Sequence, residues 1–522
     1  MCKHGKVHRR RTVLRAIAAA GLAACLGVLT ATALAPRGLR ASASAATTGS
    51  TPTAPRTTTV SASVGVTPSG AALPPGYVGV SIEFNALHDY TGRDSGKVNP
   101  ILVGLLRALA PGQSPVIRIG GNSEDQTWWP VRGTIPPGGV RYTLTPDWLA
   151  GAHALAAALN ARMIPGINLA ADRPGLAGSE ARALVQGIGR RYIDSLEIGN
   201  EPDVYSVFPW FSGRKGLSYF ARPRDYDVSL YIQDFARWAG VMPGLPLAGP
   251  AFAELTWLSG LSQFIGSEPR LREVTIHRYP LRACVTDPIA PGFPTIPALL
   301  SDNSSYAMSQ LLAPYVTVAH NAGRPFRVGE MNSAACRGRR GVSNTFAAAL
   351  WVLDTLFNFA SVGVDGVNVH TLPNAAYELF SFSNKKGRWR AFVHPEYYGM
   401  LMFAQAFPTG AQLLPVSAPA GPVKVWATRA STGRIRVVLI NKSTSTPASV
   451  QLNVPSAGGR ASLEWMRAPA VSAASGVTLG GRGFGTSSSS STLGSMRTTP
   501  ITATAGTYTI TVPAASAVML TQ

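Results

Sequence analysis

Residues 116–125 read VIRIGGNSED, and this stretch decides between two folds for the chain. A β-branched apolar run ends in two glycines and then in four polar residues, which is typical of a buried strand that enters a turn. An open, doubly wound α/β sheet normally carries a GxGxxG phosphate-binding turn after an early strand. The glycine pair here lacks that spacing, so the stretch favours a closed barrel.

Seven other short apolar runs repeat this form, and helix-like segments separate them. The runs are Tyr77–Ile82, Met163–Asn168, Ser195–Gly199, Pro246–Gly249, Glu273–Tyr279, Phe326–Glu330 and Gly366–His370. The helical segments include Pro146–Leu159, Asp225–Ala239, Ser305–Ala322, Ser343–Val362 and Tyr398–Phe407. Eight strands that alternate with helices predict an α/β fold, a (β/α)8 TIM barrel, over residues 71–410.

The pattern changes near residue 411, where short strands and turns replace the alternation. The strands are expected at Val423–Ala427, Ile435–Asn441, Ala448–Val454, Ser462–Met466, Gly476–Leu479, Thr507–Val512 and Ala517–Thr521. This predicts a C-terminal all-β sandwich domain over 411–522. Residues 46–70 are predicted to be a linker and a strand that joins the C-terminal sheet.

The composition excludes several classes of protein. Of the 522 residues 46% are hydrophobic, which excludes a largely disordered or fibrous chain. Only 14% are charged, so the net charge of +21 reflects a shortage of acids. The Lys and Arg residues are scattered and no nucleic-acid-binding motif is present, so no nucleic-acid partner is expected.

Residues 1–45 have the features of a signal peptide. They hold eight Lys and Arg and no acid, so the remainder of the chain carries +13 (21 − 8). A basic start, an apolar stretch over 16–35 and small residues over 41–46 predict secretion, and Arg10-Arg11 is similar to a twin-arginine export signal. Two alternatives stay open: an uncleaved membrane span, which needs ~20 residues, and lipid anchoring at Cys25.

The cysteines outside this leader form a lone pair, Cys284 and Cys336. In an exported chain such a pair predicts one disulfide rather than a metal site. There is no CxxC or His-rich spacing, so neither a metal nor another cofactor is expected.

Polar residues cluster where the predicted barrel strands end. In a TIM barrel these ends form the active-site rim. Glycosidic bond cleavage needs one carboxylic acid to protonate the leaving oxygen and one carboxylate to attack or to activate water. Glu201 and Glu330 end the fourth and seventh strands, so they are the candidate catalytic pair.

The strand ends also resemble a known family. Asn200-Glu201-Pro202 and Gly329-Glu330 resemble the retaining glycoside hydrolases of clan A. The wider set is similar to glycoside hydrolase family 79, the β-glucuronidase and heparanase-like family, from about residue 59 to the end. The matching segments are 79–83, 118–125, 196–203, 277–280, 329–333 and 394–399. The stretch 334–337 departs from the pattern, because no sugar-contacting side chain can be matched there.

The resemblance implies Glu201 as acid/base and Glu330 as nucleophile. Asn200 is then expected to bind the sugar 2-hydroxyl, and Tyr279 to donate to Glu330. For Arg118 two interpretations stay open: it lowers the pKa of the nucleophile, or it forms a buried ion pair for stability.

The expected sugar contacts are Glu83 and Asp125, which accept hydroxyl hydrogens, and Asn122 of the same motif. Helix capping is the alternative for Asp125. Tyr377 resembles the residue whose loop meets a uronate carboxylate, with loop packing as its alternative. His370 is expected in the core or behind the site. The tryptophans are candidates for stacking on the leaving group or on further sugars, with core packing as the default for two or more of them: Trp128, Trp129, Trp210 and Trp257.

The sequence therefore predicts a secreted retaining glycoside hydrolase that cleaves terminal β-glucuronic acid from an acidic glycan or a glucuronide. Two alternatives remain: another clan A glycosidase, such as an arabinofuranosidase or endo-glycanase, and a non-catalytic glycan-binding protein. A membrane is expected as a partner only through an uncleaved signal or a lipid anchor.

Overall fold

The computed structural model describes residues 57–455 and 459–522. The predicted signal peptide, the alternative lipid-anchor site at Cys25 and most of the linker therefore lie outside the described residues. Within those two ranges, no helix is both long enough and apolar enough to cross a bilayer.

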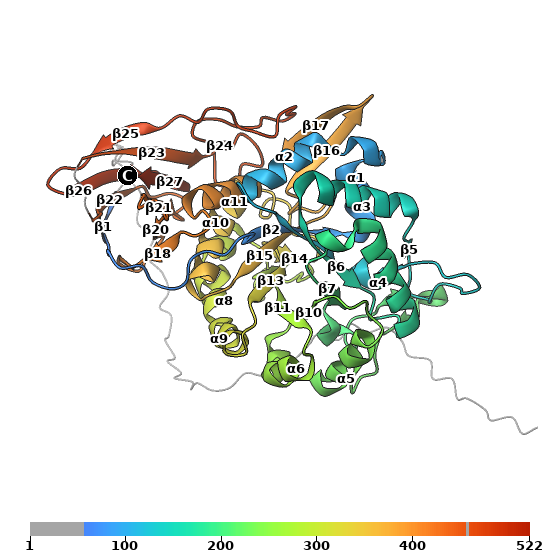
Figure 1. Ribbon diagram of the computed structural model, residues 1–522. Coiled ribbons are helices and arrows are strands. Elements are labelled where there is room, and N and C mark those ends of the chain that lie inside the picture. Colours follow the sequence, from blue (N-terminus) through green and yellow to red (C-terminus); the bar gives the residue numbers. More distant parts are fainter. Residues whose placement is uncertain (1–56, 456–458) are drawn as a thin grey trace, which may run out of the picture. The chain divides into compact units, whose positions relative to one another are not determined.

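Eight parallel strands close into a barrel (Figure 1). In sequence order, which is also the order around the barrel, they are β2 (Val78–Glu83), β3 (Val116–Gly120), β6 (Arg162–Ile167), β7 (Leu196–Ile198), β10 (Leu247–Phe252), β11 (Leu271–Arg278), β13 (Phe326–Met331) and β15 (Gly366–Thr371). β15 pairs with β2 and closes the ring. The predicted TIM barrel is confirmed.

Helices alternate with these strands. They are α1 (Leu87–Thr91), α2 (Pro100–Leu109), α3 (Pro146–Leu159), α4 (Pro174–Ile188), α5 (Val228–Ala239), α6 (Leu261–Ser267), α7 (Ile296–Leu300), α8 (Tyr306–Gln310), α9 (Ala313–Asn321), α10 (Phe346–Ser361) and α11 (Pro395–Ala406). The predicted single helix over Ser305–Ala322 was wrong. Pro314 lies in the first turn of α9, and because proline has no N–H and blocks the preceding turn, the helix breaks before it.

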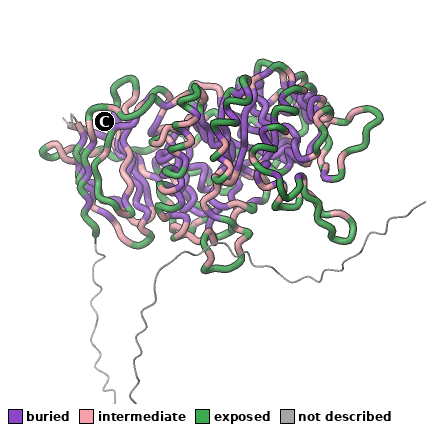
Figure 2. Tube along the Cα trace, turned by 90° about the horizontal axis from the view of Figure 1, so that it is seen from below, coloured by how far each residue is buried: buried purple, intermediate pink, exposed green. Residues whose placement is uncertain are grey.

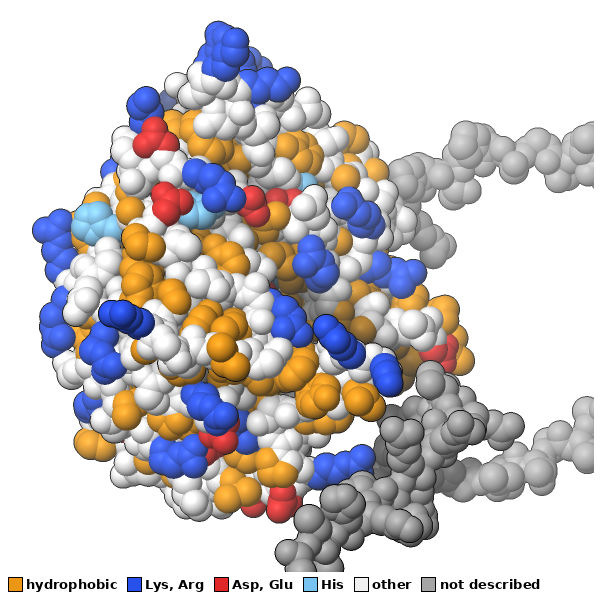
Figure 3. Space-filling model, turned by 90° about the vertical axis from the view of Figure 1, so that its right-hand side faces the viewer, with side chains coloured by type: hydrophobic (Ala, Val, Ile, Leu, Met, Phe, Trp, Pro, Cys, Tyr) orange, Lys and Arg blue, Asp and Glu red, His pale blue; other side chains and the backbone are white. Residues whose placement is uncertain are grey.

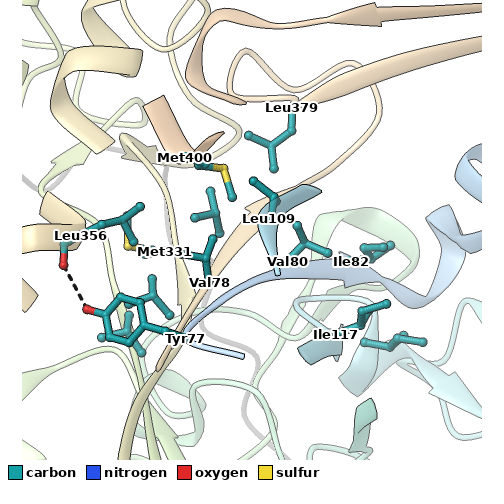
Figure 4. Packing of buried hydrophobic residues seen from close by; sticks show 14 of the residues in the cluster. Tyr77, Val78, Val80, Ile82, Leu109, Ile117, Met331, Leu356, Leu379 and Met400 are labelled. Carbon is teal, nitrogen blue, oxygen red and sulfur yellow. Dashed lines mark hydrogen bonds between the residues drawn. The ribbon is translucent and has the colours of Figure 1, made fainter. Parts of the chain in front are cut away.

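The barrel strands are buried on both faces, which explains why they read as apolar runs rather than as alternating patterns. All six residues of β2 are buried, and Figure 2 shows the burial continuing through the barrel strands while the loops are exposed. Figure 4 shows Val78, Val80 and Ile82 of β2 packed among side chains of neighbouring elements. The Tyr77 hydroxyl donates to the Leu356 carbonyl (3.0 Å) at this core.

The C-terminal part forms two packed sheets, which confirms the predicted β-sandwich. One sheet has the order β19 (Val416–Ser417), β1 (Thr58–Val64), β22 (Ala448–Asn453), β26 (Thr507–Val512). The other has the order β18 (Gln412–Leu414), β20 (Val423–Arg429), β21 (Ile435–Asn441), β27 (Ser516–Thr521), β23 (Arg460–Arg467), β24 (Thr478–Leu479), with β25 (Thr499–Thr502) beside β23. β1 runs parallel to β22, so a strand that precedes the barrel lies inside this domain.

β21 contacts both cores of the molecule. Val437 and Leu439 belong to the sandwich core, while Val438 and Ile440 join the barrel core. Successive side chains of a strand point to opposite faces, so this strand is apolar throughout because each face is covered by a different domain.

A buried ion pair reinforces this seam between barrel and sandwich. Lys442 follows β21 and donates to Asp354 of α10 (2.7 Å), and Trp426 of β20 donates to the same carboxylate (3.0 Å). Burial alone would raise the pKa of Asp354, but Lys442 holds it below its usual value.

Candidate active site

Glu201 stands directly after the C-terminal end of β7. Its backbone is left-handed (φ 53°, ψ 54°), which is costly for a residue other than glycine. The conformation is fixed from both sides. Its N–H donates to the Ala251 carbonyl (3.1 Å), and Asp203 accepts from the backbone N–H groups of Ala253 (3.0 Å) and Glu254 (2.5 Å) at the end of β10. With this backbone conformation the Glu201 carboxylate lies 3.1 Å from Nδ1 of His277.

Glu330 is the fifth residue of β13, and its carboxylate is bound on both oxygens. The Tyr279 hydroxyl donates to Oε1 (2.7 Å), and Nη1 of Arg118 donates to Oε2 (2.8 Å). Nδ1 of His370 lies 3.5 Å from Oε2. The carboxylate is thus buried, oriented and surrounded by donors.

These neighbours decide the charge of Glu330. Burial alone would raise its pKa, because a low-dielectric surrounding disfavours the charged form. His370 and His277 oppose this effect most strongly, followed by Arg118 and the Tyr279 hydrogen bond, and together they lower the pKa of Glu330 to about 2. The carboxylate is therefore ionised at any ordinary pH, as a nucleophile must be.

Arg118 anchors a larger charge network beneath the site. Its guanidinium donates to Glu330, to Ser81 (3.1 Å), to the Asn200 amide oxygen (3.1 Å), to Glu124 (3.5 Å) and to Glu197. A guanidinium has five N–H groups, and five contacts occupy them here. The two interpretations of Arg118 are therefore compatible, since the same buried ion-pair network lies inside the barrel and lowers the pKa of Glu330.

Glu201 and Glu330 face each other closely. One ligand atom each of Glu201, His277 and Glu330 lies within 4.8 Å of the others. Among the described residues, these three form the group that could hold a metal ion. The cationic Arg118 on Oε2 and the Tyr279 donor on Oε1 already use both oxygens of Glu330, so the donor set suits an ionised nucleophile better than a metal ligand.

Glu83, predicted as a sugar contact, lies at the end of β2 and holds the turn after β3. Its carboxylate accepts from the backbone N–H groups of Asn122 (3.2 Å) and Ser123 (2.7 Å) and from the Ser123 hydroxyl. Gly121 makes this approach possible, because a Cβ there would lie 2.7 Å from the carboxyl group. The Asn122 side chain is exposed on the rim.

Asp125 is fully engaged with the protein. One carboxylate oxygen accepts from the N–H groups of Leu169 (3.1 Å) and Ala170 (3.2 Å), and the other from Tyr205 (2.5 Å) and the Asn200 N–H (3.4 Å). Burial raises its pKa to about 6, against the effect of these hydrogen bonds. Asp125 joins the ends of β6 and β7 and does not cap a helix, which was its predicted alternative, and its role as a sugar contact stays a prediction.

Tyr377 lies at the rim, where its ring centroid is 6.3 Å from that of Tyr279 and 5.9 Å from that of His370. Burial raises its pKa, so it remains a neutral hydroxyl donor. His370 lies behind the two carboxylates, as expected: Nε2 is 3.7 Å from Glu83, while Nδ1 approaches Glu330.

The predicted disulfide is confirmed. Cys284 and Cys336 are bonded, with their Cα atoms 5.7 Å apart. They follow two short paired strands, β12 (Leu281–Arg282) and β14 (Ala334–Ala335), which continue the neighbouring barrel strands β11 and β13 at the rim. The Arg337 carbonyl then accepts the Ala376 N–H (2.8 Å), so the bridge is linked to the loop that carries Tyr377.

His277 had no predicted role, yet it contacts Glu201 and helps to lower the pKa of Glu330. One signal was available, since His277 directly precedes the Arg278-Tyr279 end of its strand. Glu124 and Glu197 were also missed. Both lie within the quoted strand-end motifs, but only the closed barrel shows that they point at Arg118.

The chain is similar to proteins of known class. Residues 425–519 match the family model described as the glycosyl hydrolase family 79 C-terminal beta domain. A β-glucuronidase of Neurospora crassa is 27% identical over 347 residues, 58% of each chain, so the match spans less than two thirds of that relative. A β-glucuronidase of Aspergillus niger is 25% identical over 425 residues, covering 73% of this chain and 75% of the relative.

Solved structures share the fold. A 4-O-α-L-rhamnosyl-β-D-glucuronidase from Fusarium oxysporum 12S superposes with a TM-score of 0.64 at 21% identity, over 88% of this chain and 100% of that one. A GH51 arabinofuranosidase from Xanthomonas axonopodis pv. citri gives 0.62 at 15% identity, over 89% and 99%. The C-terminal domain thus matches a glycoside hydrolase family 79 model, and the similarity to the two β-glucuronidases supports the same family for the chain.

Proposed function

We propose that this protein is a secreted, retaining β-glucuronidase that removes a terminal β-linked uronic acid by double displacement. The observation that carries the proposal is the pairing of Glu201 and Glu330, which bring carboxylate oxygens within 4.8 Å of each other. Carboxyl groups ~5–5.5 Å apart are typical of retention, whereas inverting enzymes separate them by ~6.5–9.5 Å to admit a water.

The environments of the two carboxylates support different roles. Glu330 is 8% exposed and has both oxygens fixed by donors, so it suits attack on the anomeric carbon. Glu201 is 23% exposed and contacts one ring nitrogen of His277, so it suits exchange of a proton with the leaving group and then with water.

The reaction then has two steps. Glu330 attacks the anomeric carbon while Glu201 gives its proton to the glycosidic oxygen, and the leaving group departs. Glu201 next takes a proton from water, whose oxygen attacks the same carbon and releases Glu330. The Asn200 amide oxygen is held by Arg118, so its amide nitrogen is the group left to bind the sugar 2-hydroxyl.

Recognition of a uronate rests on neutral donors. A carboxylate in a closed pocket must be hydrogen-bonded, because leaving it unpaired costs several kcal/mol. Tyr377 and its loop can supply such bonds, and the disulfide wall fixes the loop from the other side. A site built to bind a carboxylate rejects the neutral sugar, since its donors would then be left unpaired.

The experiment is a panel of aryl glycosides with the same leaving group: β-glucuronide, β-glucoside, β-xyloside and α-arabinofuranoside. We expect the glucuronide to exceed the glucoside at least about tenfold in kcat/KM, which corresponds to ~1.4 kcal/mol in the barrier. Proton NMR of the first product should show the β-anomer. Equal rates on glucuronide and glucoside, a preference for a pentoside, or an inverted product would contradict the proposal.

A further inference from the structure

The loop after β7 exposes a concentration of large apolar side chains. Among the described residues, eleven large hydrophobic side chains are exposed, and five of them lie between positions 207 and 220. They are Val207, Phe208, Leu217, Tyr219 and Phe220. Scattered apolar residues are ordinary on a protein surface, whereas a local group indicates a binding surface. We name these five residues the apolar hairpin surface.

This surface lies on a short hairpin and on the turn that leads into it. β8 (Phe211–Ser212) pairs with β9 (Ser218–Tyr219), and the rings of Phe211 and Tyr219 stack with centroids 4.6 Å apart. Trp210 donates through its backbone N–H to the Tyr219 carbonyl (2.7 Å) and through its indole N–H to the Asp125 carbonyl (2.8 Å). A surface that is fixed before binding loses little conformational entropy when a ligand binds.

A second loop, over 130–141, supports the hairpin and projects to the right in Figure 1 ahead of β5 (Tyr142–Thr143). Its glycines pack directly on the hairpin rings: a Cβ on Gly139 would lie 2.2 Å from Trp210, and one on Gly138 3.0 Å from Phe211. Figure 3 faces this side and shows hydrophobic side chains interspersed with Lys and Arg, with fewer Asp and Glu.

The apolar hairpin surface lies on the side of the acid/base. Glu201 begins the loop that carries the hairpin, and backbone hydrogen bonds lead from Val204 N–H to the Glu201 carbonyl and from Phe208 N–H to the Val204 carbonyl. The acid protonates the oxygen of the leaving group, so the leaving group must lie next to Glu201. Trp210 at the base of the hairpin bonds to Asp125, which in turn accepts from the N–H of Asn200 beside Glu201, so we place the hairpin next to the space into which the leaving group, the aglycone, extends.

We propose that the apolar hairpin surface binds an aromatic, uncharged aglycone of the substrate. The proposal rests on the proposed function, because it uses Glu201 as the acid. Valine, leucine and phenylalanine side chains offer contact area but no hydrogen bonds, so an aromatic ring covers them without burying unpaired polar groups. The segment 207–220 has no acid, and its Arg214 and Lys215 are compatible with the faces of aromatic rings.

The test compares two substrates with the same sugar, a 2-naphthyl and a methyl β-glucuronide. We expect a Phe208→Ser/Phe220→Ser double variant to lose about tenfold in kcat/KM on the naphthyl substrate and less than about twofold on the methyl substrate. Because each variant is compared with the wild type on each substrate, the difference in leaving-group reactivity cancels. Tyr306→Ser is the matched control, since Tyr306 is an exposed aromatic residue on α8, and it should change neither value.

Three outcomes would overturn the inference. The double variant could lose activity equally on both substrates, it could lose activity on neither, or it could change only the oligomeric mass or the binding to neutral lipid vesicles. Failure of the proposed function is distinguishable from these, because the wild type would then turn over neither glucuronide. The same aryl and methyl pair, built on whichever sugar the panel identifies, then tests the hairpin independently. Thermal unfolding of each variant verifies that it is folded.

Discussion

The barrel contains two buried arginine–glutamate clusters at opposite ends. They differ in whether a carboxylate of the cluster reaches the barrel mouth. The upper cluster is Arg118 with Glu124, Glu197 and Glu330 beneath the mouth. The lower cluster is Arg327 with Glu273 (2.9 Å) and Asn368 (3.1 Å), near the N-terminal ends of β11, β13 and β15.

The hydrogen bonds of the lower cluster all go to other protein groups. Ser195 donates to Glu273 (3.3 Å), and Asn368 donates to the Val80 (2.9 Å) and Val116 (3.2 Å) carbonyls. Gly366 leaves room for the Arg327 guanidinium, which a Cβ there would approach to 2.3 Å. The upper cluster instead presents Glu330 to the mouth beside Glu201. The same charge pairing is therefore enclosed by protein at one end and reaches the proposed catalytic pair at the other.

The largest expected effect is on activity at the upper end. Glu330→Gln removes the nucleophile but keeps the side-chain shape, so we expect kcat to fall by about 10⁴-fold or more. Steady-state kinetics on an aryl glucuronide measure this loss. Circular dichroism should show the native fold, and a variant that keeps more than about a tenth of the wild-type rate would contradict the mechanism.

Glu201→Ala should have a smaller effect that depends on the substrate. General acid catalysis contributes about 10²–10⁴-fold, and a leaving group that needs no protonation loses least. We expect a strong loss on the methyl glucuronide and a weaker one on a 4-nitrophenyl glucuronide. An equal loss on the two substrates would show that Glu201 is not the acid.

At the lower end, Arg327→Met should reduce stability without changing the chemistry. Removal of one partner leaves Glu273 as an uncompensated buried charge, which costs about 3–5 kcal/mol of unfolding free energy. Denaturant titration measures the loss, and kcat per folded molecule should stay within about twofold of the wild type. A specific loss of kcat in a fully folded Arg327→Met enzyme would remove the distinction between the two clusters.

The disulfide tests the upper wall separately from the charges. A Cys284→Ser/Cys336→Ser variant should lose about 2–4 kcal/mol of unfolding free energy, because the bridge spans 52 residues and restricts the unfolded chain. We expect KM for the glucuronide to rise more than kcat falls, since the bridge supports the loop of Tyr377 and not the catalytic pair. Thermal scans and kinetics in parallel measure both; unchanged stability would contradict the expectation.

The smallest effect is the pH dependence of stability. The pKa of Glu330 is held at about 2, below its unfolded value of about 4.3. A depressed pKa contributes stability that is present above the unfolded value and is lost as the pH falls toward 2. Between about pH 5 and pH 2, the wild type should lose roughly 2–3 kcal/mol more than Glu330→Gln. Denaturant titrations at several pH values measure this difference, and Arg327→Met should keep the wild-type slope.

The positions of many site residues could be predicted from the ends of the barrel strands. Apolar runs followed by acids placed Glu201 and Glu330 on one rim, because parallel strands of a barrel all end at the same face. The cysteine pairing could be predicted for a simpler reason, because the sequence outside the predicted signal peptide has only two cysteines. The helix break before Pro314 could also have been predicted from the proline. The prediction of a single helix was wrong because it relied on the spacing of apolar residues alone.

The sequence by itself determined the order of strands and helices, the sandwich that follows them and which residues stand at the strand ends, since these depend on local patterns. Only the tertiary structure decided which partners those residues bind and which backbone conformations they adopt. Arg118 binds partners up to 212 positions away in the sequence. The Asp125 carboxylate accepts from three backbone N–H groups and from the Tyr205 hydroxyl. Glu201 adopts a left-handed backbone conformation. Such contacts depend on the register with which the barrel closes, and that register comes from the packing of the whole ring rather than from any one segment.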